Sequence, residues 1–350
     1  MGFTRTLAGI CMTAALLCAS AAGAAEPVPM KTAWLGEHET FAVWYAKEKG
    51  WDKEAGLDLS MLRFDSGKTI VEGVLAYDWA IAGCGAVPAL TAALSDRLDV
   101  IAVANDESAA NALYVRADSP ILAATGANPA YPAVRGDRDS VRGREILCPR
   151  GTSAHYMTAM WLKALGLTEQ DVRLRDMTAT QALGAFAGGL GDAVALWAPL
   201  TYDADARGFK PAALSRDCGV SQPVLIVANH DYAVKHPDRI EAFLKVYLRA
   251  VTALRENPEA LAADYIRFYE SWTGRKLTTE LAVQDLRNHP VFTLDEQLAL
   301  FDDADGKGQL RSWLADIAAF FDGIGMVRQE DRARLERMNA VTDVYLKALR

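Results

Sequence analysis

The sequence predicts an α/β protein built from two similar halves and a helical tail. The first observation is that short apolar strands alternate with amphipathic helices across residues 30–232, a pattern typical of sheets flanked by helices. The second is that the pattern changes near Pro237, after which only helical stretches follow. The third is size: 350 residues, 51% hydrophobic and 23% charged, are enough for two domains rather than one oversized core.

The first half reads as a strand–helix alternation with a parallel sheet. Strands are expected at 30–35, 57–64, 98–106 and 111–118, and a strand, glycine turn and helix at 78–94. A loop is expected at 36–40 ("GEHET"). The helix at 41–50 carries Phe41, Trp44 and Tyr45 on one stripe, and a second helix begins near Ser66 within 65–77.

The second half repeats the alternation after a long loop at 119–143, which suggests a junction or an insertion. A strand at 144–150 leads into a helix at 153–166 that Gly166 closes. The segments 171–177, 178–189, 192–198 and 199–208 repeat the strand–helix pattern, and 222–232 is one more strand. Helices then follow at 236–257, 258–272 and 278–289.

Residues 1–24 have the composition of a removable secretory signal. They hold Arg5 as their single charged residue, an apolar run, and an A-x-A cleavage pattern at 22–24. A lipoprotein anchored through Cys18 is the alternative, although Leu17 is bulkier than that processing usually accepts. Removal of the signal moves the formal charge from -8 to -9. An exported acidic protein without basic clusters is not expected to bind nucleic acid.

Three cysteines remain in the mature chain: Cys84, Cys148 and Cys218. Export permits a Cys148–Cys218 disulfide, which would leave Cys84 free. No CxxC or HxxxH spacing occurs, so neither a metal site nor a cofactor is predicted.

The stretch "GTSAH" at 151–155 has two opposed interpretations. Ser153 and His155 could be a nucleophile and its base. On a helix, however, residues two positions apart point about 200° away from each other, so the histidine is badly placed for that role. A helix start with free N–H groups suits an anion instead, while a simple N-cap with nothing bound stays open.

Three more turns share this design at the ends of expected strands. "SGKT" at 66–69 lacks the first glycine of a phosphate loop, because Leu62 stands there. "GCGA" at 83–86 allows close backbone approach or tight helix–strand packing. Trp197 could stack on a ligand or belong to the core. With the acidic loop at 37–39, these turns would line one cleft, because open α/β sheets bind ligands at the carboxyl ends of strands.

Three segments in this order resemble a known family: 48–90, 141–167 and 191–210. The family is the periplasmic substrate-binding proteins of ABC importers, in the branch serving sulfonates, taurine, nitrate and thiamine-precursor pyrimidines. The resemblance covers nearly all of the mature chain. It implies a type II binding-protein fold, with two α/β lobes joined by a two-stranded hinge crossing near 108–118 and 222–230. Lobe I would comprise 25–110 and 227–350, including the helical tail, and lobe II 111–226.

The resemblance also implies a ligand cleft and a transport role. The residues expected to line the cleft are Glu37, His38, Glu39, Thr40, Phe41, Ser66, Gly67, Gly83, Cys84, Gly85, Ala86, Thr152, Ser153, Ala154 and Trp197. A monomeric periplasmic receptor, not an enzyme, would carry a small organic ligand to a membrane permease. We expect a sulfonate or a zwitterion such as taurine, with Glu37 or Glu39 on the amine.

Two alternatives stay open. The same fold could hold a cationic or aromatic, pyrimidine-like nutrient between Phe41, Trp44 and Trp197. An exported hydrolase using Ser153 or Cys84 would need a nearby base. The other histidines, at positions 38, 230, 236 and 289, are scattered along the sequence. This scatter also disfavours a thiamine-pyrimidine synthase of similar fold, which would need a histidine-rich region.

Overall fold

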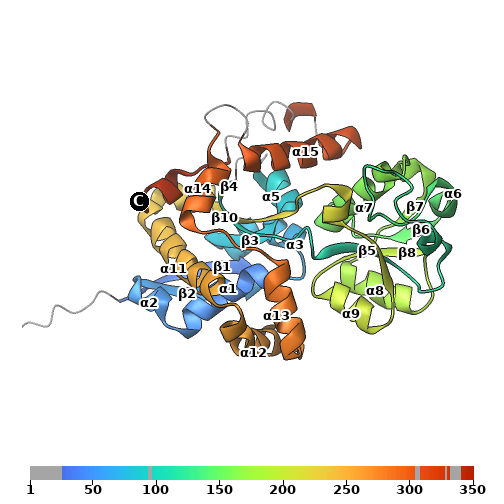
Figure 1. Cartoon of the computed structure of the whole chain (residues 1–350). Helices are drawn as coiled ribbons and strands as arrows, with labels where there is room; N and C mark the ends of the chain where they lie inside the picture. The colour runs from blue at the N-terminus through green and yellow to red at the C-terminus, as the bar shows by residue number, and fades with distance from the viewer. Residues whose placement is uncertain (1–25, 94–96, 304–307, 328, 332–339) are drawn as a thin grey trace, which may run out of the picture.

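The computed structural model describes residues 26–93, 97–303, 308–327, 329–331 and 340–350. Two five-stranded sheets lie next to each other, each surrounded by helices (Figure 1). The secretory signal expected at 1–24 and the anchor alternative at Cys18 lie outside the described residues. Within the described ranges, no helix is long and apolar enough to cross a membrane.

The first sheet has the order β2-β1-β3-β10-β4. Its strands are β1 (Val28–Trp34), β2 (Leu57–Arg63), β3 (Ile81–Gly85), β4 (Leu98–Asp106) and β10 (Pro223–Asn229). Strands β1, β2 and β3 pair in parallel, but β10 is antiparallel to both of its neighbours. The expectation of a parallel sheet is therefore wrong for β10. The chain comes back from the second sheet into β10, which lies between β3 and β4 and runs opposite to both.

The second sheet has the order β7-β6-β8-β5-β9. Its strands are β5 (Asn111–Val115), β6 (Glu145–Leu147), β7 (Arg173–Arg175), β8 (Ala193–Trp197) and β9 (Lys210–Leu214). Strand β5 is antiparallel to β8 and β9. The sequence analysis did not predict β9, which contains Pro211, a residue that cannot donate to a sheet ladder. Proline is tolerated there because β9 is an edge strand.

Helices follow these strands in both sheets. They are α1 (His38–Glu48), α2 (Trp51–Glu54), α3 (Gly67–Glu72), α4 (Val74–Tyr77), α5 (Ala86–Ala93), α6 (Arg138–Val141), α7 (Ser153–Ala164), α8 (Ala179–Ala187) and α9 (Leu200–Ala206). Ser66 caps α3 by accepting the Thr69 N–H at 3.2 Å. Helix α1 begins within the predicted loop at 36–40, so Glu39 lies in its first turn. Gly166, at φ +68°, follows α7 as predicted.

The chain passes between the sheets twice, at 107–110 and at 215–222. The first passage overlaps the crossing expected at 108–118, and the second ends where the crossing expected at 222–230 begins. The two crossings lie side by side, because the Glu107 N–H donates to the Gln222 carbonyl at 3.0 Å. We use lobe I for the first sheet with its helices and the C-terminal helices, and lobe II for the second sheet with α6 to α9.

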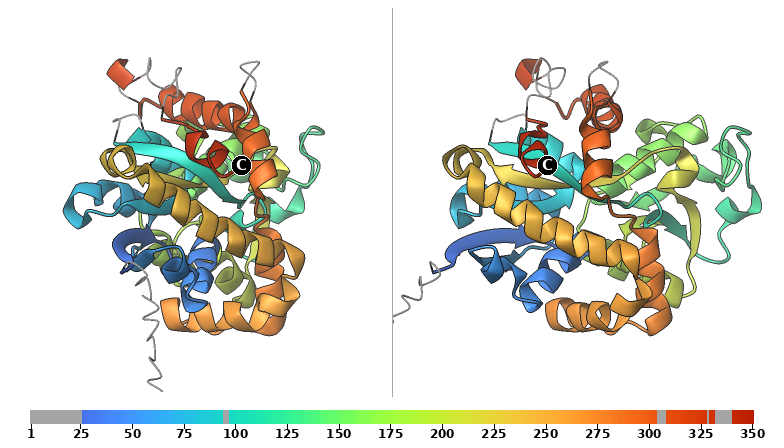
Figure 2. Two further views of the ribbon diagram at one scale, coloured as in Figure 1. Left: turned by 90° about the vertical axis from the view of Figure 1, so that its left-hand side faces the viewer. Right: turned by 60° about the vertical axis from the view of Figure 1, so that its left-hand side comes forward.

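The tail after β10 is helical, as expected. Its helices are α10 (His230–Lys235), α11 (Pro237–Glu256), α12 (Ala262–Thr273), α13 (Thr279–Asn288), α14 (Leu294–Phe301), α15 (Gln309–Gly323) and α17 (Val344–Lys347). Figure 2 shows α11 running along lobe I, where it packs on α1 and α17. Helices α13 and α15 reach lobe II: Tyr202 of α9 donates to Asp285 of α13, and His155 of α7 contacts Phe321 of α15.

Candidate functional site

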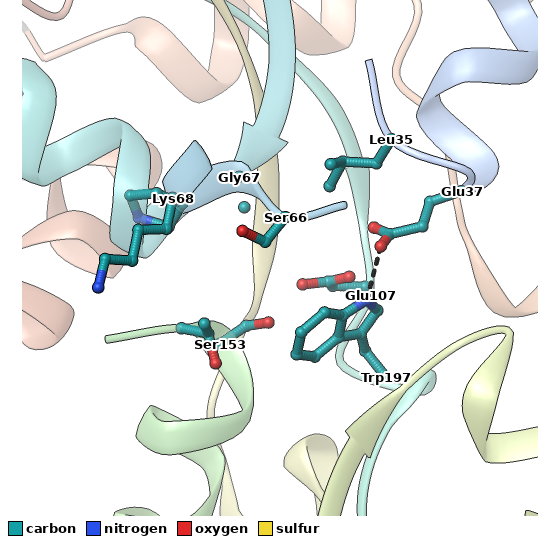
Figure 3. Close-up of a pocket in the computed structure, with 11 residues that line it drawn as sticks. Leu35, Glu37, Ser66, Gly67, Lys68, Glu107, Ser153 and Trp197 are labelled. Atoms are coloured by element: carbon teal, nitrogen blue, oxygen red, sulfur yellow. Dashed lines mark hydrogen bonds between the residues drawn. The ribbon is translucent and has the colours of Figure 1, made fainter. Parts of the chain in front are cut away.

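A small cavity lies between the two lobes (Figure 3). Its volume of about 30 Å³ has room for only about two water molecules, since each needs roughly 10–15 Å³. Lobe I and the first crossing supply Leu35, Glu37, Ser66, Gly67, Lys68, Gly85, Pro88 and Glu107, and lobe II supplies Thr152, Ser153 and Trp197.

The sheet topology explains why these residues meet. Strands β1, β2, β3 and β4 run in one direction, so their carboxyl ends share one edge of the first sheet. Strands β6 and β8 are likewise parallel in the second sheet. The cavity therefore lies where the carboxyl edges of both sheets face each other, the usual place for ligands in open α/β sheets.

The start of α7 lines this cavity through Thr152 and Ser153 and has no side-chain cap. Thr152 occupies the N-cap position, but its hydroxyl donates to the Pro149 carbonyl at 2.6 Å and accepts no hydrogen bond from the helix. The first N–H groups of this twelve-residue helix therefore lack a side-chain cap. Ser153 is 8% exposed, and the Gln222 side chain holds its carbonyl at 3.0 Å.

His155 points away from the cavity, as the helical spacing predicts. Its Nδ1 accepts the Gly151 N–H at 3.2 Å, and its Nε2 lies 2.8 Å from Glu169 Oε1. The fully buried ring packs against Phe320 and Phe321 of α15. His155 thus anchors α7 to the C-terminal helices and cannot serve Ser153 as a base.

The glycine of the α3 turn is required by packing. A Cβ on Gly67 would lie 2.8 Å from Pro88 Cγ and 2.9 Å from Cys84 Cβ, both much closer than carbon atoms tolerate. The absence of a side chain lets α3 approach β3 and α5. This close approach brings Ser66 to the cavity wall.

Trp197 and Glu37 join the two lobes across the cavity. The indole N–H of Trp197 donates to Glu37 Oε1 at 2.5 Å. Burial, together with repulsion from Glu39 and Glu107, raises the pKa of Glu37 well above its ordinary value. The aromatic ring at the end of β8 therefore both lines the cavity and orients a carboxyl group of the other lobe.

A second carboxyl group, Glu107, faces the same cavity from the crossing after β4 (Figure 3). The residue is 5% exposed. Burial raises the pKa of Glu107 to about 7, while His289 and hydrogen bonds from Asn111 and Ser153 act in the opposite direction. The cavity thus has two carboxyl groups whose ionisation is disfavoured by their surroundings.

Only some of the residues predicted to line the cleft line this cavity. Those that line it are Glu37, Ser66, Gly67, Gly85, Thr152, Ser153 and Trp197. The structure places the others in the interior beside it: His38, Glu39, Thr40, Phe41, Gly83, Cys84, Ala86 and Ala154. The main cause is that α1 begins at His38, so its first turn directs side chains into lobe I rather than along a loop.

Two of these interior residues belong to one packing arrangement. A Cβ on Gly83 would lie 2.6 Å from Trp34 Cζ3 and 3.0 Å from Glu39 Cγ. Gly83 therefore leaves room for the Trp34 ring and the Glu39 side chain, which corresponds to the packing alternative for the glycine turn. Glu39 is 2% exposed, and its burial raises its pKa to about 8.

Phe41 and His38 also pack in the interior, where both contact Tyr265. The Phe41 ring makes an edge contact with Tyr265 at 4.8 Å between ring centroids. His38 Nδ1 lies 3.0 Å from the Tyr265 hydroxyl, and its ring stacks on His289. His38 lines a different cavity, of about 140 Å³, at the end of α13.

The three described cysteines are free and buried. The Cys148–Cys218 bridge that export would permit is not formed in this structure: Cys148 Sγ lies 3.6 Å from the Thr158 hydroxyl instead. Burial raises the pKa of Cys148 and of Cys218 to about 12 and raises that of Cys84 as well. A buried thiol of this kind is a poor nucleophile.

The sequence interpretation does not single out four of the lining residues: Leu35, Lys68, Pro88 and Glu107. Leu35 is the last residue of one predicted strand and Glu107 directly follows another, so the rule that ligands lie at carboxyl ends applied to both. Lys68 and Pro88 adjoin predicted turns. Nothing local distinguishes Glu107 from a solvated charge, because its burial results from the meeting of the two crossings.

Comparison with known proteins adds evidence from sequence. The model of the NMT1-like family matches residues 23–266. A protein of Brachyspira hyodysenteriae described as an ABC transporter periplasmic binding protein is 26% identical over 70% of this chain and 70% of its own. The taurine-binding periplasmic protein of Escherichia coli is 24% identical over 59% of this chain and 61% of its own.

Solved structures show the same fold. The alkanesulfonate-binding protein of Xanthomonas axonopodis pv. citri, bound to MOPS, superposes with a TM-score of 0.70 at 18% sequence identity. The similarity covers 91% of this chain and 99% of that one. The fold that the sequence predicted, two α/β lobes with C-terminal helices, is confirmed, as is the family resemblance.

Proposed function

The chain belongs to the NMT1-like family, and from that premise we propose that it is the periplasmic solute-binding protein of an ABC importer. It closes on a small organic ligand and delivers it to a membrane permease. Relatives described as periplasmic binding proteins support this role. The observation that carries the proposal is the cavity between the carboxyl edges of both sheets, because one ligand there contacts both lobes.

The size of the cavity supports an opening and closing cycle. Its volume of about 30 Å³ is too small for an organic solute. A ligand therefore enters only when the lobes separate, and contacts to both sides then favour the closed population. We propose that the crossings at 107–110 and 215–222 form the hinge and bound the two domains.

We further propose that the ligand is a sulfonate or a zwitterion such as taurine. The uncapped N–H groups at the start of α7, next to Thr152 and Ser153, would hold its anionic group without a basic residue. Relatives named for taurine and alkanesulfonate support this ligand class. A cationic or aromatic nutrient is the second candidate, because Trp197 and Glu37 also line the cavity.

The geometry supports a receptor over a hydrolase. His155 is not placed to serve Ser153 as a base, because its two nitrogens contact Gly151 and Glu169 instead. Cys84 is fully buried, and its burial raises its pKa, so little thiolate forms at neutral pH.

A thermal-shift screen of the mature protein tests the proposal. Taurine, alkyl sulfonates, nitrate, alkylamines and pyrimidines form the panel, and a ligand of the folded state raises the melting temperature. Ser153→Phe should abolish the shift, while Ser271→Phe, the same change at an exposed position of α12, should retain it. Turnover of generic esters or amides that is lost in Cys84→Ala would contradict the receptor role.

A further inference from the structure

Glu107 occupies a special position at the joint between the lobes. Its N–H donates to Gln222 in the second crossing, and its carbonyl accepts the N–H of Ala110 at 2.8 Å and of Asn111 at 3.0 Å. The backbone is therefore held by both crossings. The carboxyl group lies against Gly85, where an added Cβ would be 3.8 Å from Glu107 Oε1.

The carboxyl group is aimed into the cavity between Ser66, Ser153 and Trp197 (Figure 3). It is nine-tenths buried, yet neither it nor Glu37 forms an ion pair with any cation among the residues that the structure describes. Lys68 also lines the cavity, but its exposed ammonium group lies 4.0 Å from Glu72 Oε1. The described residues thus place two carboxyl groups on one small cavity without a direct ion-pair partner, and His289 acts on Glu107 only through its charge.

An ammonium group is the ligand group that satisfies this arrangement. An ammonium group carries only donors, so it would donate charge-assisted hydrogen bonds to both carboxylates. It would also lie near the Trp197 ring, whose face attracts cations. The indole N–H already orients Glu37 at 2.5 Å. A simple alkyl group in the same place would leave both carboxyl groups buried without an ion-pair partner, which is costly when they are ionised.

We propose that Glu107 is the specificity-determining residue of this site and that, together with Glu37, it selects ligands with a protonated amine. The inference rests on the proposed function, because it assigns the amine end of a ligand whose anionic end lies at the start of α7. The ligand class is then an aminoalkyl anion such as an aminosulfonate, and plain alkanesulfonates are weak ligands.

Isothermal titration calorimetry with taurine, ethanesulfonate and ethylammonium chloride tests the inference. Taurine and ethanesulfonate differ only in the amine. The wild-type protein should bind taurine at least tenfold more tightly than ethanesulfonate. Glu107→Gln, which keeps the shape of the side chain, should weaken taurine binding by about 10- to 100-fold and leave ethanesulfonate unchanged or tighter. Glu37→Gln should reduce the same preference.

The pH dependence gives a readout that a purely structural role would not change. The charged groups around Glu107 are Glu37, Glu39, Asp106 and His289, with Lys68 on the cavity wall. Because burial raises the pKa of Glu107 to about 7, the affinity for taurine should rise between pH 5.5 and 8.5 as the carboxyl group ionises. Glu107→Gln should flatten this rise.

Several results would overturn the inference and still leave the proposed receptor function standing. Equal affinity of the wild-type protein for taurine and ethanesulfonate is one. Affinity that falls as the pH rises is another, because it means that protonated carboxyl groups donate to an anion. If the protein binds none of the three compounds, the inference is also rejected. The receptor role fails only if no other compound of the thermal-shift panel raises the melting temperature either.

Discussion

Replacing Gly83 by alanine should destabilise the fold and leave ligand binding nearly unchanged, although only Cys84 separates it from the cavity residue Gly85. The added Cβ would lie 2.6 Å from Trp34 Cζ3, roughly 1 Å inside the distance at which carbon atoms pack well. Trp34 cannot retreat, because it is fully buried and its indole N–H donates to the Thr32 hydroxyl at 2.7 Å. Overpacking of this kind costs about 1–3 kcal/mol.

Gly85→Ala is the matched control, since its added Cβ meets nothing closer than Glu107 Oε1 at 3.8 Å. Neither glycine has a positive φ, so alanine fits both backbones. At position 85 the reduced freedom of the unfolded chain should leave stability unchanged or raise it by about 0.4–1 kcal/mol. The methyl group would instead narrow a cavity of about 30 Å³ and weaken ligand binding.

Urea unfolding followed by circular dichroism measures the first effect, and calorimetry with the best ligand of the screen measures the second. Gly83→Ala should lower the unfolding midpoint and keep the ligand affinity within about threefold. Gly85→Ala should do the reverse. An unchanged midpoint for Gly83→Ala, or a loss in Gly85→Ala as large as in Gly83→Ala, would refute the packing explanation for this turn.

Other consequences can be checked with the same unfolding assay. Tyr202→Phe removes a hydrogen bond of 2.5 Å to the buried carboxylate of Asp285 and should lower the free energy of unfolding by about 1.5–3 kcal/mol. An unfolding midpoint equal to that of the wild-type protein would contradict this. The folded pKa of Glu39 and of Glu107 is raised, to about 8 and about 7, and that of His289 to about 9. Their contribution to stability is therefore present at acidic pH and lost as the pH rises through these values, so the midpoint should fall from pH 5 to 9 and fall less in Glu39→Gln. The three buried thiols should react with a thiol reagent in urea and not in the native mature protein, and rapid labelling without urea would contradict their burial.

The elements could be read from the sequence because their signals are local. Alternation of apolar residues gave the strands, and Ser66 and Gly166 stand at the start of α3 and just past the end of α7 because capping and left-handed backbone act within one turn. The turn at 151–155 was placed at the end of a strand for the same reason. The opposed directions of Ser153 and His155 follow from helical geometry alone.

The tertiary structure decided what depends on contacts between distant segments. The antiparallel course of β10 follows from the return of the chain from lobe II, which no local pattern encodes. Glu39 and Glu37 look alike in the sequence, but the start of α1 turns one into the core and the other into the cavity. Glu107 became a site residue only because two crossings more than a hundred positions apart meet beside it. Burial sets the ionisation and reach of a side chain, and burial is created by such long-range contacts.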